Sequence, residues 1–292
     1  MSPPLIVFTD LDSTLLDHED YSYEAAKPAL LQLEEANIPL IINTSKTLAE
    51  VFELRQAMNN AHPFVTENGA AIYIPDNYFA QNPADCEPID WNGAALWEYR
   101  QPSRRKDFQG LISAAAAHAG VIEGQDFTTF AALGPEGIAR ATGLSVDDAR
   151  LANQRAGSEP VQWLSSAAVP RQFISHLQQA GARVIEGGRF LHVMDGNSSK
   201  GNAMHWLARN YTRKPGASSP SNDRLPYQLA ALGDSPNDID MLNAADYAMV
   251  IRKKSGDAMQ LEQSKAWMTS NAPAPAGWAE CVGALLSHLA LA

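Results

Sequence analysis

The chain has 292 residues, 45% of them hydrophobic, which allows one large or two moderate folded domains and excludes a largely disordered chain. The 33 acidic and 22 basic residues give a formal net charge of -11, which repels nucleic acid and anionic membranes, so neither is an expected partner. A small phosphorylated metabolite stays compatible with this charge, because a local lysine and a bound cation can reverse the sign inside a pocket.

Two strand and helix units open the chain. Leu5 to Phe8 is a continuous apolar run, and residues 23–37 carry apolar side chains at helical spacing. Ile38 to Ile42 is a second apolar run, and residues 48–58 return to helical periodicity. Strands without polar alternation, separated by helices, indicate a parallel sheet that is covered on both faces.

The same alternation returns late in the chain. The predicted elements there are a strand at 189–194, a helix at 200–211, a strand at 228–232, a helix at 237–244 and a last strand at 247–251. The stretch between the two halves has strand candidates of its own, at 96–100, 127–131 and 161–164. We therefore expect a core domain of residues 1–84 and 189–292, with residues 85–188 inserted as a second α/β domain.

The cysteines and the N-terminus bear on where the protein works. Cys86 and Cys281 lie far apart and without metal-ligand spacing, so neither a disulfide framework nor a zinc site is indicated, and a cytoplasmic location is expected. No basic leader precedes Leu5, so a signal peptide is not supported. No apolar stretch approaches the roughly 20 residues that a membrane-spanning helix needs.

Asp10 and Asp12 are the first candidates for chemistry. They follow the apolar run at Leu5 directly, so they project from the carboxyl edge of the predicted sheet, where open α/β folds bind ligands. Residues two apart in an extended segment point to the same side, so one carboxylate could attack a phosphorus atom while the other protonates the leaving oxygen. A pair of turn-capping acids is the alternative.

Thr44, Ser45 and Lys200 are candidates for binding a phosphoryl group. Thr44 and Ser45 follow the second apolar strand and offer hydroxyl groups and loop amides, although residues of this type also cap helices. Lys200 opens a predicted helix, where the helix dipole disfavours a cation unless an anion lies nearby. A solvated surface lysine is the alternative for Lys200.

The segment Gly233-Asp-Ser-Pro-Asn-Asp238 is the sharpest motif. It joins a predicted strand to a predicted helix and brings Asp234, Asn237 and Asp238 together within five positions. Carboxylate and amide oxygens are the hard ligands that Mg²⁺ prefers. A helix cap accounts for one of these residues but not for all of them, so the motif predicts a magnesium site.

The four motifs, in this order, resemble those of the haloacid dehalogenase superfamily. The position of the insertion and the turn Glu67-Asn-Gly-Ala70 resemble the subgroup with a large α/β cap. The resemblance implies a Rossmann-like parallel-sheet core with an inserted α/β cap domain. The segments 43–47, 141–144, 158–160 and 188–192 are most similar to mannosyl-3-phosphoglycerate phosphatases. Ser13, where glycine is usual, and Ala156-Gly157, where bulkier residues are usual, depart from the pattern.

The resemblance also implies a mechanism and a set of roles. Asp10 would form an aspartyl-phosphate and Asp12 would act as acid and base. Mg²⁺ would be held by Asp10, the Asp12 carbonyl and Asp234, with Asp238 as a further acid. Thr44, Ser45 and Lys200 would hold the phosphoryl group. Arg189 and His192 are candidates for the carboxylate or hydroxyls of the substrate, followed by Arg155, Ser158 and Glu159.

The expected reaction is magnesium-dependent hydrolysis of a phosphomonoester on a small sugar-type metabolite, with mannosyl-3-phosphoglycerate as the implied substrate. Glucosyl-3-phosphoglycerate, sucrose phosphate and simple hexose phosphates remain open as alternatives, as does a phosphosugar mutase. A sugar-phosphate sensor without turnover is the alternative outside enzymes, although a pure binder has no need of a nucleophilic Asp10 beside an anionic ligand. The sequence leaves the oligomeric state open.

Overall fold

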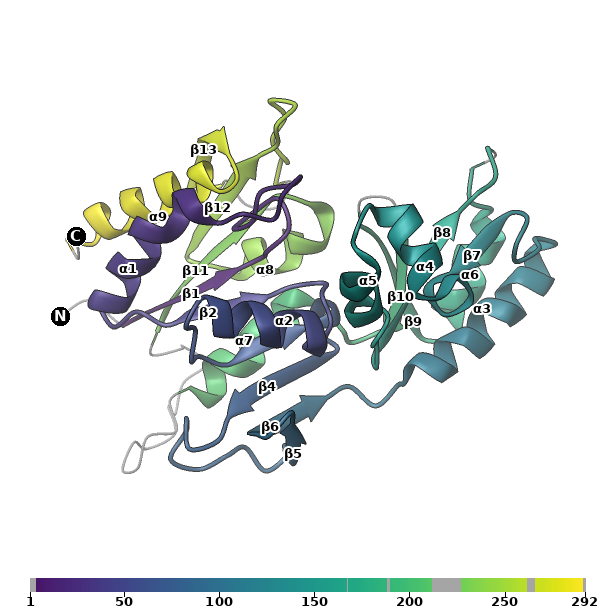
Figure 1. Cartoon of the computed structure of the whole chain (residues 1–292), viewed down its shortest axis with the longest axis horizontal. Coiled ribbons are helices and arrows are strands. Elements are labelled where there is room, and N and C mark those ends of the chain that lie inside the picture. Colours follow the sequence, from purple (N-terminus) through teal and green to yellow (C-terminus); the bar gives the residue numbers. More distant parts are fainter. Residues whose placement is uncertain (1–3, 167, 188–189, 212–226, 262–265, 291–292) are drawn as a thin grey trace.

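The computed structural model describes residues 4–166, 168–187, 190–211, 227–261 and 266–290. It shows two α/β units side by side, a larger core and a smaller cap, with both termini on the core (Figure 1). In the described part of the chain, no helix combines the length and the apolar character that crossing a bilayer requires.

The core is built on one nine-stranded sheet in the order β13-β12-β11-β1-β2-β3-β4-β6-β5. The strands from β13 to β3 run parallel, and β4, β6 and β5 extend the sheet antiparallel. In chain order the bounds are β1 Leu5–Thr9, β2 Leu40–Asn43, β3 Phe64–Thr66, β4 Ala71–Pro75, β5 Glu87–Trp91, β6 Ala94–Arg100, β11 Gln228–Gly233, β12 Tyr247–Arg252 and β13 Met268–Pro273. The predicted parallel α/β core is confirmed.

Helices cover both faces of this sheet, as the unbroken apolar strands require. Every residue of β1 is buried, with Val7 packed on one face and Ile6 and Phe8 on the other. One face is covered by α1 (Lys27–Glu35), α2 (Leu48–Ala57) and α9 (Ala276–His288), with the short η1 (Glu24–Ala26) before α1. The other face is covered by α7 (Lys200–Asn210) and α8 (Ile239–Ala244). The parallel strands are therefore packed on both faces.

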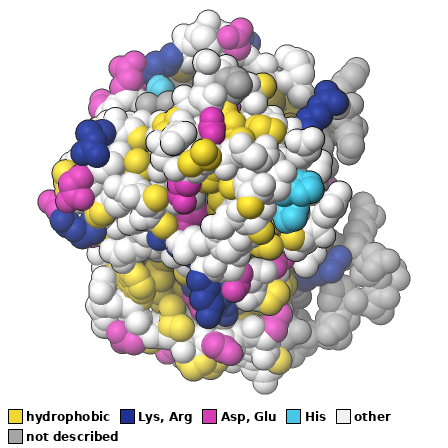
Figure 2. Space-filling view, turned by 90° about the vertical axis from the view of Figure 1, so that its right-hand side faces the viewer, with side chains coloured by type: hydrophobic (Ala, Val, Ile, Leu, Met, Phe, Trp, Pro, Cys, Tyr) yellow, Lys and Arg dark blue, Asp and Glu magenta, His cyan; other side chains and the backbone are white. Residues whose placement is uncertain are grey.

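The cap is a second α/β unit with its own hydrophobic core. Its antiparallel sheet has the order β7-β8-β10-β9, with bounds β7 Phe127–Thr129, β8 Ser158–Trp163, β9 Ala182–Gly187 and β10 Phe190–Asp195. α3 (Arg105–Ala119) and α6 (Arg171–Gln179) pack on one face of this sheet, whereas α5 (Val146–Ala152), which follows α4 (Phe130–Thr142), lies nearest the core (Figure 1). Charged side chains of both signs are interspersed on the described surface at the cap end (Figure 2).

The strand pairing shows that the chain passes between core and cap at other positions than the sequence predicts. Residues 96–100, expected in the cap, form β6 of the core sheet, because β4 turns back into an antiparallel extension. Residues 190–194, expected in the core, form β10 of the cap sheet between β8 and β9. The chain thus crosses near 101–104 and 196–199 rather than near 85 and 188. We propose a core of 1–101 and 196–292 and a cap of 102–195.

Two further elements differ from the sequence prediction. The strand predicted at 127–131 ends at Thr129, because the Thr129 hydroxyl caps α4 by accepting from the Ala132 amide. The sheet does not end with β12, because β13 pairs with it at the edge. β13 has the sequence Met-Thr-Ser-Asn-Ala-Pro, which lacks the apolar run by which the other core strands are identified.

Candidate active site

A cleft of about 640 Å³ lies between the core and the cap. Its core wall comes from the loops that follow β1, β2, β11 and β12, at the carboxyl edge of the parallel strands. Its cap wall comes from the segment that carries α4 and α5 and from β9 and β10. The lining side chains include Asp10, Asp12, Ser45, Lys46, Asp234 and Asn237 on the core side, and Phe130, Leu144, Arg155, Phe190 and His192 on the cap side.

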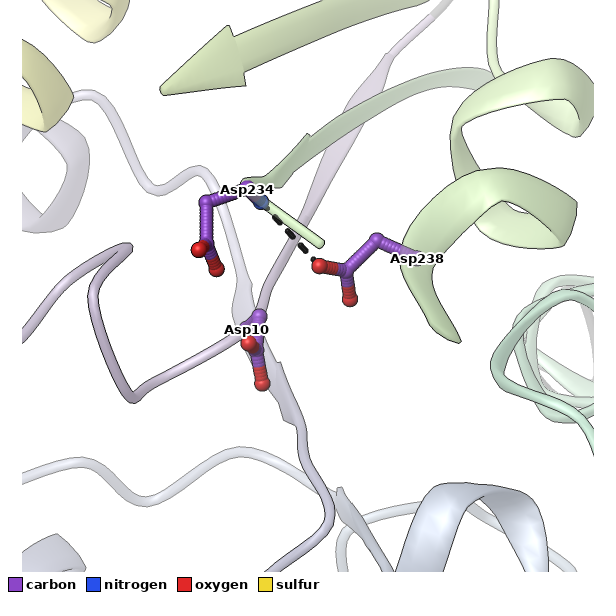
Figure 3. Close-up of side chains that lie close together, drawn as sticks. All are labelled: Asp10, Asp234 and Asp238. Carbon is purple, nitrogen blue, oxygen red and sulfur yellow. Dashed lines mark hydrogen bonds between the residues drawn. The ribbon is translucent and has the colours of Figure 1, made fainter. Parts of the chain in front are cut away.

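Asp10 lies at the centre of a group of three acids. It follows β1, and its amide donates to the Leu232 carbonyl of β11 at 3.0 Å, which ties its backbone to the neighbouring strand. Asp234 and Asp238 come from the loop after β11, which passes through the short η3 (Pro236–Asp238) into α8. One carboxylate oxygen from each acid lies within 4.8 Å of the others, and all three residues are buried (Figure 3).

Lys200 is the cation of this group. It is fully buried as the first residue of α7, and its Nζ lies 2.7 Å from Asp10 Oδ1 and 2.6 Å from Asp238 Oδ1. Asn43 at the end of β2 donates from its side chain to the Lys200 carbonyl at 2.9 Å and fixes the start of the helix. The strand that precedes Lys200, β10, belongs to the cap sheet and not to the core sheet. Lys200 therefore lies just after the point where the chain passes from the cap back into the core.

Asp238 holds both Lys200 and its own loop. Its Oδ2 accepts from the backbone amide of Asp234 at 3.1 Å (Figure 3) and from that of Ser235, also at 3.1 Å. Its Oδ1 accepts from Lys200, so both oxygens are engaged within the protein. Asp234 Oδ1 accepts from the Thr14 hydroxyl at 3.2 Å. Asp10 and Asp234 are therefore better placed than Asp238 to offer oxygens to a bound cation.

The pKa values of the acids reflect their burial and crowding. Burial raises the pKa of Asp10 to about 8, Lys200 opposes this shift, and the charges of Asp238, Asp234 and Asp12 add to it. Burial also raises the pKa of Asp234 to about 6, again with Asp238 acting in the same direction and Lys200 against it. Three carboxylates beside one ammonium group carry excess negative charge when ionised, and either protons or a metal cation can relieve it.

A divalent cation fits this group on three grounds. The donors are carboxylate oxygens, which are the ligands of hard cations such as Mg²⁺. They converge in a buried space. Burial and the neighbouring acids raise the pKa of Asp10 and Asp234, so a bound cation would stabilise their ionised forms. The Asp12 side chain is not part of this group among the described residues. Binding of the metal by the backbone carbonyl of Asp12 stays a prediction.

The stabilisation by Mg²⁺ should therefore depend on pH. A carboxyl whose pKa is higher in the folded protein than in the unfolded chain binds its proton more tightly when folded. The stability of the metal-free protein thus falls as the pH rises from 3.8 through about 6 for Asp234 and about 8 for Asp10. We expect excess Mg²⁺ to raise Tm more at pH 8.5 than at pH 5, by roughly 5 °C, measured by calorimetry.

Asp234→Asn is the control for this pH dependence. The amide removes one ligand and one negative charge, so the variant should lose most of the Mg²⁺ effect at pH 8.5 while keeping its fold. An equal rise of Tm at both pH values in the natural protein would show that the three acids do not bind the ion.

Asp12 has a partner that sequence reasoning missed. Its carboxylate is partly exposed in the cleft, and its Oδ1 lies 3.0 Å from Nζ of Lys46, which also lies 3.5 Å from Glu50 Oε1. Lys46 and Glu50 stand four positions apart around the start of α2, a spacing that by itself indicates an ordinary helix-surface pair. The pairing with Asp12 holds that carboxylate beside the cleft, apart from the three clustered acids.

Thr44 and Ser45 form the loop between β2 and α2. Thr44 is fully buried, and its Oγ1 accepts from the Lys46 amide at 3.3 Å. Ser45 lines the cleft. The N-cap of α2 is Thr47, which exchanges hydrogen bonds with Glu50 in a capping box, so the helix is not capped by Thr44 or Ser45. Phosphate binding by Thr44 and Ser45 stays a prediction.

His192 lies on β10 and lines the cleft from the cap. It is 9% exposed, and its Nδ1 has no hydrogen-bond partner among the described residues. Burial lowers the pKa of His192 to about 3, and the positive charges of Arg155 and Lys200 add to this effect. The imidazole is therefore neutral at physiological pH and suits a hydroxyl group better than a carboxylate. Arg189, the other leading candidate, lies outside the described residues.

The remaining cap candidates separate into two groups. Arg155 lines the cleft, and its guanidinium donates to the Ser45 carbonyl at 2.6 Å and to the Ser158 hydroxyl at 2.9 Å. Ser158 and Glu159 are fully buried. Glu159 accepts from Arg105 Nε at 2.6 Å and from the Ala131 amide at 3.1 Å, so it joins parts of the cap. We therefore do not assign Glu159 to the substrate site.

Family models and a curated relative match both parts of the chain. Residues 7–90 match the haloacid dehalogenase-like hydrolases, and residues 162–284 match sucrose-6F-phosphate phosphohydrolase. The chain is 35% identical over 251 residues to a glucosyl-3-phosphoglycerate/mannosyl-3-phosphoglycerate phosphatase from Methanococcoides burtonii. The matched region covers 86% of this chain and 86% of that relative.

Solved structures share the fold. A sugar phosphatase of haloacid dehalogenase subclass IIB has a TM-score of 0.62 at 14% identity, covering 98% of this chain and 99% of that chain. A phosphatase of the same superfamily from Bacteroides thetaiotaomicron has a TM-score of 0.55 at 16% identity, covering 99% and 96%. These likenesses cover the cap as well as the core and confirm the predicted fold class.

Proposed function

We propose that this chain, which belongs to the haloacid dehalogenase superfamily of phosphatases, hydrolyses mannosyl-3-phosphoglycerate to mannosylglycerate and phosphate. The observation that carries the substrate is the 35% identity to the archaeal phosphatase named above. It covers 86% of the chain and so includes most of the cap, which forms one wall of the cleft. The superfamily and the hydrolysis of phosphomonoesters, both predicted from the four motifs, are confirmed by the same relative.

The chemistry is assigned to Asp10 and Asp12. A carboxylate oxygen of Asp10 forms a bond to phosphorus in line with the departing glycerate oxygen, and the ester bond breaks as Asp12 gives that oxygen a proton. Water then attacks the aspartyl-phosphate, Asp12 accepts its proton, and inorganic phosphate and Asp10 are released. Both residues line the cleft, Asp10 as a buried side chain and Asp12 as a partly exposed one, and these two environments support the division of roles.

The charge of the phosphoryl group requires cations around Asp10. Lys200 supplies one at 2.7 Å from the nucleophile, and its second partner Asp238 keeps it there. We infer that Mg²⁺ is the metal and that Asp10, Asp234 and the Asp12 carbonyl hold it. When bound, the ion would screen the negative charge of the nucleophile and of the phosphoryl oxygens.

The sugar is assigned to the cap wall. Phe130 and Phe190 line the cleft with ring centroids 5.0 Å apart in an edge-to-face pair, and they offer apolar surface to the ring of a hexose. Neutral His192 offers a buried ring nitrogen to a hydroxyl group. Lys253, from the loop after β12, lines the core wall and suits the carboxylate of glycerate. We further propose a cytoplasmic location, because the only two cysteines, Cys86 and Cys281, lie far apart in the sequence and do not form the pattern of a disulfide framework.

Sucrose-phosphate hydrolysis is the second candidate, since residues 162–284 match that family. The test is phosphate release with Mg²⁺ from mannosyl-3-phosphoglycerate, glucosyl-3-phosphoglycerate, sucrose 6-phosphate and simple hexose 6-phosphates. We expect kcat/KM for a glycosyl-3-phosphoglycerate to exceed that for hexose phosphates by at least about tenfold. The reason is that the glycosyl-3-phosphoglycerate contacts both the core wall and the cap wall of the cleft, whereas a hexose phosphate does not. A preference for sucrose 6-phosphate, or equal rates on all compounds, would overturn the substrate but not the reaction.

A further inference from the structure

The turn Glu67–Gly69, here called the docking turn, holds two loops of the active site by its backbone. It follows β3 as the short helix η2, with Glu67 and Asn68 at φ values of 49° and 57°, in a region that residues other than glycine rarely adopt. The Glu67 amide donates to the Lys46 carbonyl and the Asn68 amide to the Thr44 carbonyl, each at 2.9 Å. The unusual backbone is thus supported by the loop between β2 and α2.

The docking turn also contacts the other two loops that carry motifs. Asn68 Oδ1 accepts from the Asn237 side chain, in the loop of Asp234 and Asp238, at 3.0 Å. Gly69 lies so close to the start of α7 that an added Cβ would stand 2.2 Å from the Ser199 carbonyl oxygen, one residue before Lys200. One turn therefore contacts the loop of Thr44 and Ser45, the loop of Asp234 and Asp238, and the start of the helix that carries Lys200.

The side chain of Glu67 points the other way, into the cap. Its partners lie in residues 155–158, here called the cap loop, immediately before and at the start of β8. Glu67 Oε1 accepts from the Ala156 amide at 2.9 Å, and Oε2 accepts from the Gly157 amide at 3.1 Å and the Ser158 hydroxyl at 2.6 Å. Arg155 Nε lies 3.7 Å away. Both Glu67 and Arg155 are buried side chains in this arrangement.

The fit of the cap loop on the core is close. A Cβ at Gly157 would lie 2.7 Å from Cβ of Ala70, so only glycine lets the loop approach this far. Arg155 donates across the same junction to the Ser45 carbonyl at 2.6 Å. The Thr47 hydroxyl donates to the Leu151 carbonyl of α5 at 2.9 Å. These bonds join the cap to the loop that carries Thr44 and Ser45.

We propose that Glu67 is a positioning residue that docks the cap loop on the core and thereby closes the sugar-binding wall over the phosphate site. A buried carboxylate is stable only when its hydrogen bonds are complete, and the cap loop completes them for Glu67. The same turn holds the core loops by its backbone, which does not depend on the Glu67 carboxylate, so loss of that carboxylate should release the cap loop and leave the core loops in place. This proposal rests on the proposed function for its choice of substrate.

The first test compares two substrates in Glu67→Gln. The amide keeps the size of the side chain but loses one acceptor oxygen and the charge that faces Arg155. We expect kcat/KM for mannosyl-3-phosphoglycerate to fall at least about 30-fold. For p-nitrophenyl phosphate, which has no sugar to be enclosed, we expect a change of less than about threefold. Equal losses on both substrates, or no loss on either, would overturn the proposal.

A paired substitution separates docking from folding. Gly157→Ala should reproduce the selective loss, because its methyl group meets Ala70, and Ala70→Gly added to it should restore most of the activity on the larger substrate. If mannosyl-3-phosphoglycerate is not hydrolysed, the same comparison uses the bulkiest substrate that is, so the proposed substrate and the docking role fail separately. Absence of rescue by Ala70→Gly would contradict the close fit as the cause.

Hydrogen exchange tests the dock without any substrate. In the natural protein the amides of Ala156 and Gly157 donate to Glu67 and should exchange slowly. In Glu67→Gln we expect their exchange to speed up at least about tenfold, while the amides of β1 and β11 stay as protected as before. Unchanged exchange of these two amides in Glu67→Gln would contradict the proposal, even if the activity of the variant fell.

Discussion

We expect Asp10→Asn to lower phosphate release by at least about 10³-fold on every substrate that the natural protein hydrolyses. The amide has nearly the same size as the carboxylate, but it is neutral and a poor nucleophile, so no bond to phosphorus forms. The variant should still fold for two reasons. Lys200 keeps Asp238 as a partner 2.6 Å away, and the hydrogen bond from the backbone amide of residue 10 to the Leu232 carbonyl of β11 does not involve the side chain.

The measurement is phosphate release in the presence of Mg²⁺, with the fold checked by circular dichroism. Asp20→Asn is a matched control, since Asp20 is an exposed acid in the same segment and outside the cleft lining. It should retain full activity. Activity of Asp10→Asn within tenfold of the natural protein would place the nucleophile elsewhere. Absence of turnover in the natural protein on every substrate would favour the sugar-phosphate sensor instead.

The second large effect is expected on stability, from Lys200→Met. Lys200 is fully buried between Asp10 and Asp238, and their charges hold the pKa of its ammonium above the usual range despite burial, which acts the other way. A lysine with a raised pKa contributes stability throughout neutral pH. Replacing it by an apolar side chain leaves three buried acids without their cation, which we expect to cost about 3–5 kcal/mol of unfolding free energy without metal.

The loss should be larger at pH 8.5 than at pH 5, because protonation of Asp10 and Asp234 relieves the repulsion that Lys200 no longer balances. Denaturant unfolding at both pH values measures it. Lys254→Met is the matched control: Lys254 also faces two acids, Asp17 and Glu19, but it is exposed, and its loss should not measurably change stability. A Lys200→Met protein as stable as the natural one at pH 8.5 would show that the buried ion pairs contribute little.

The strand assignments show where sequence reasoning works and where it stops. β1, β2 and β11 are apolar runs buried on both faces, and this local pattern suffices to predict them. β10 carries an equally plain strand signal, but a strand signal does not say which sheet a strand joins. That choice depends on the partners β8 and β9, which lie in the cap. β13 has no apolar run and is held at the sheet edge by pairing alone.

The candidate site divides in the same way. Asp10, Asp234, Asp238 and Lys200 were predicted because their motifs occur in one order, each beside the end of a predicted strand, and together resemble those of the haloacid dehalogenase superfamily. The pairing of Asp12 with Lys46 was not predicted, since the two residues belong to different loops. Glu67 was identified from the sequence only as part of the turn Glu67-Asn-Gly-Ala70, whereas in the structure its carboxylate reaches the cap loop about 90 positions later in the chain.

By itself the sequence determined the fold class, the order of the motifs and the side chains available for phosphoryl transfer, because apolar runs, turns and helix starts are local patterns. Only the tertiary structure decided where the chain passes between core and cap, which acids share Lys200, and that the docking turn joins the cap loop to the core. The physical reason is that burial, charge pairing and close packing arise between segments far apart in the chain, and local sequence patterns do not reveal which of these segments meet.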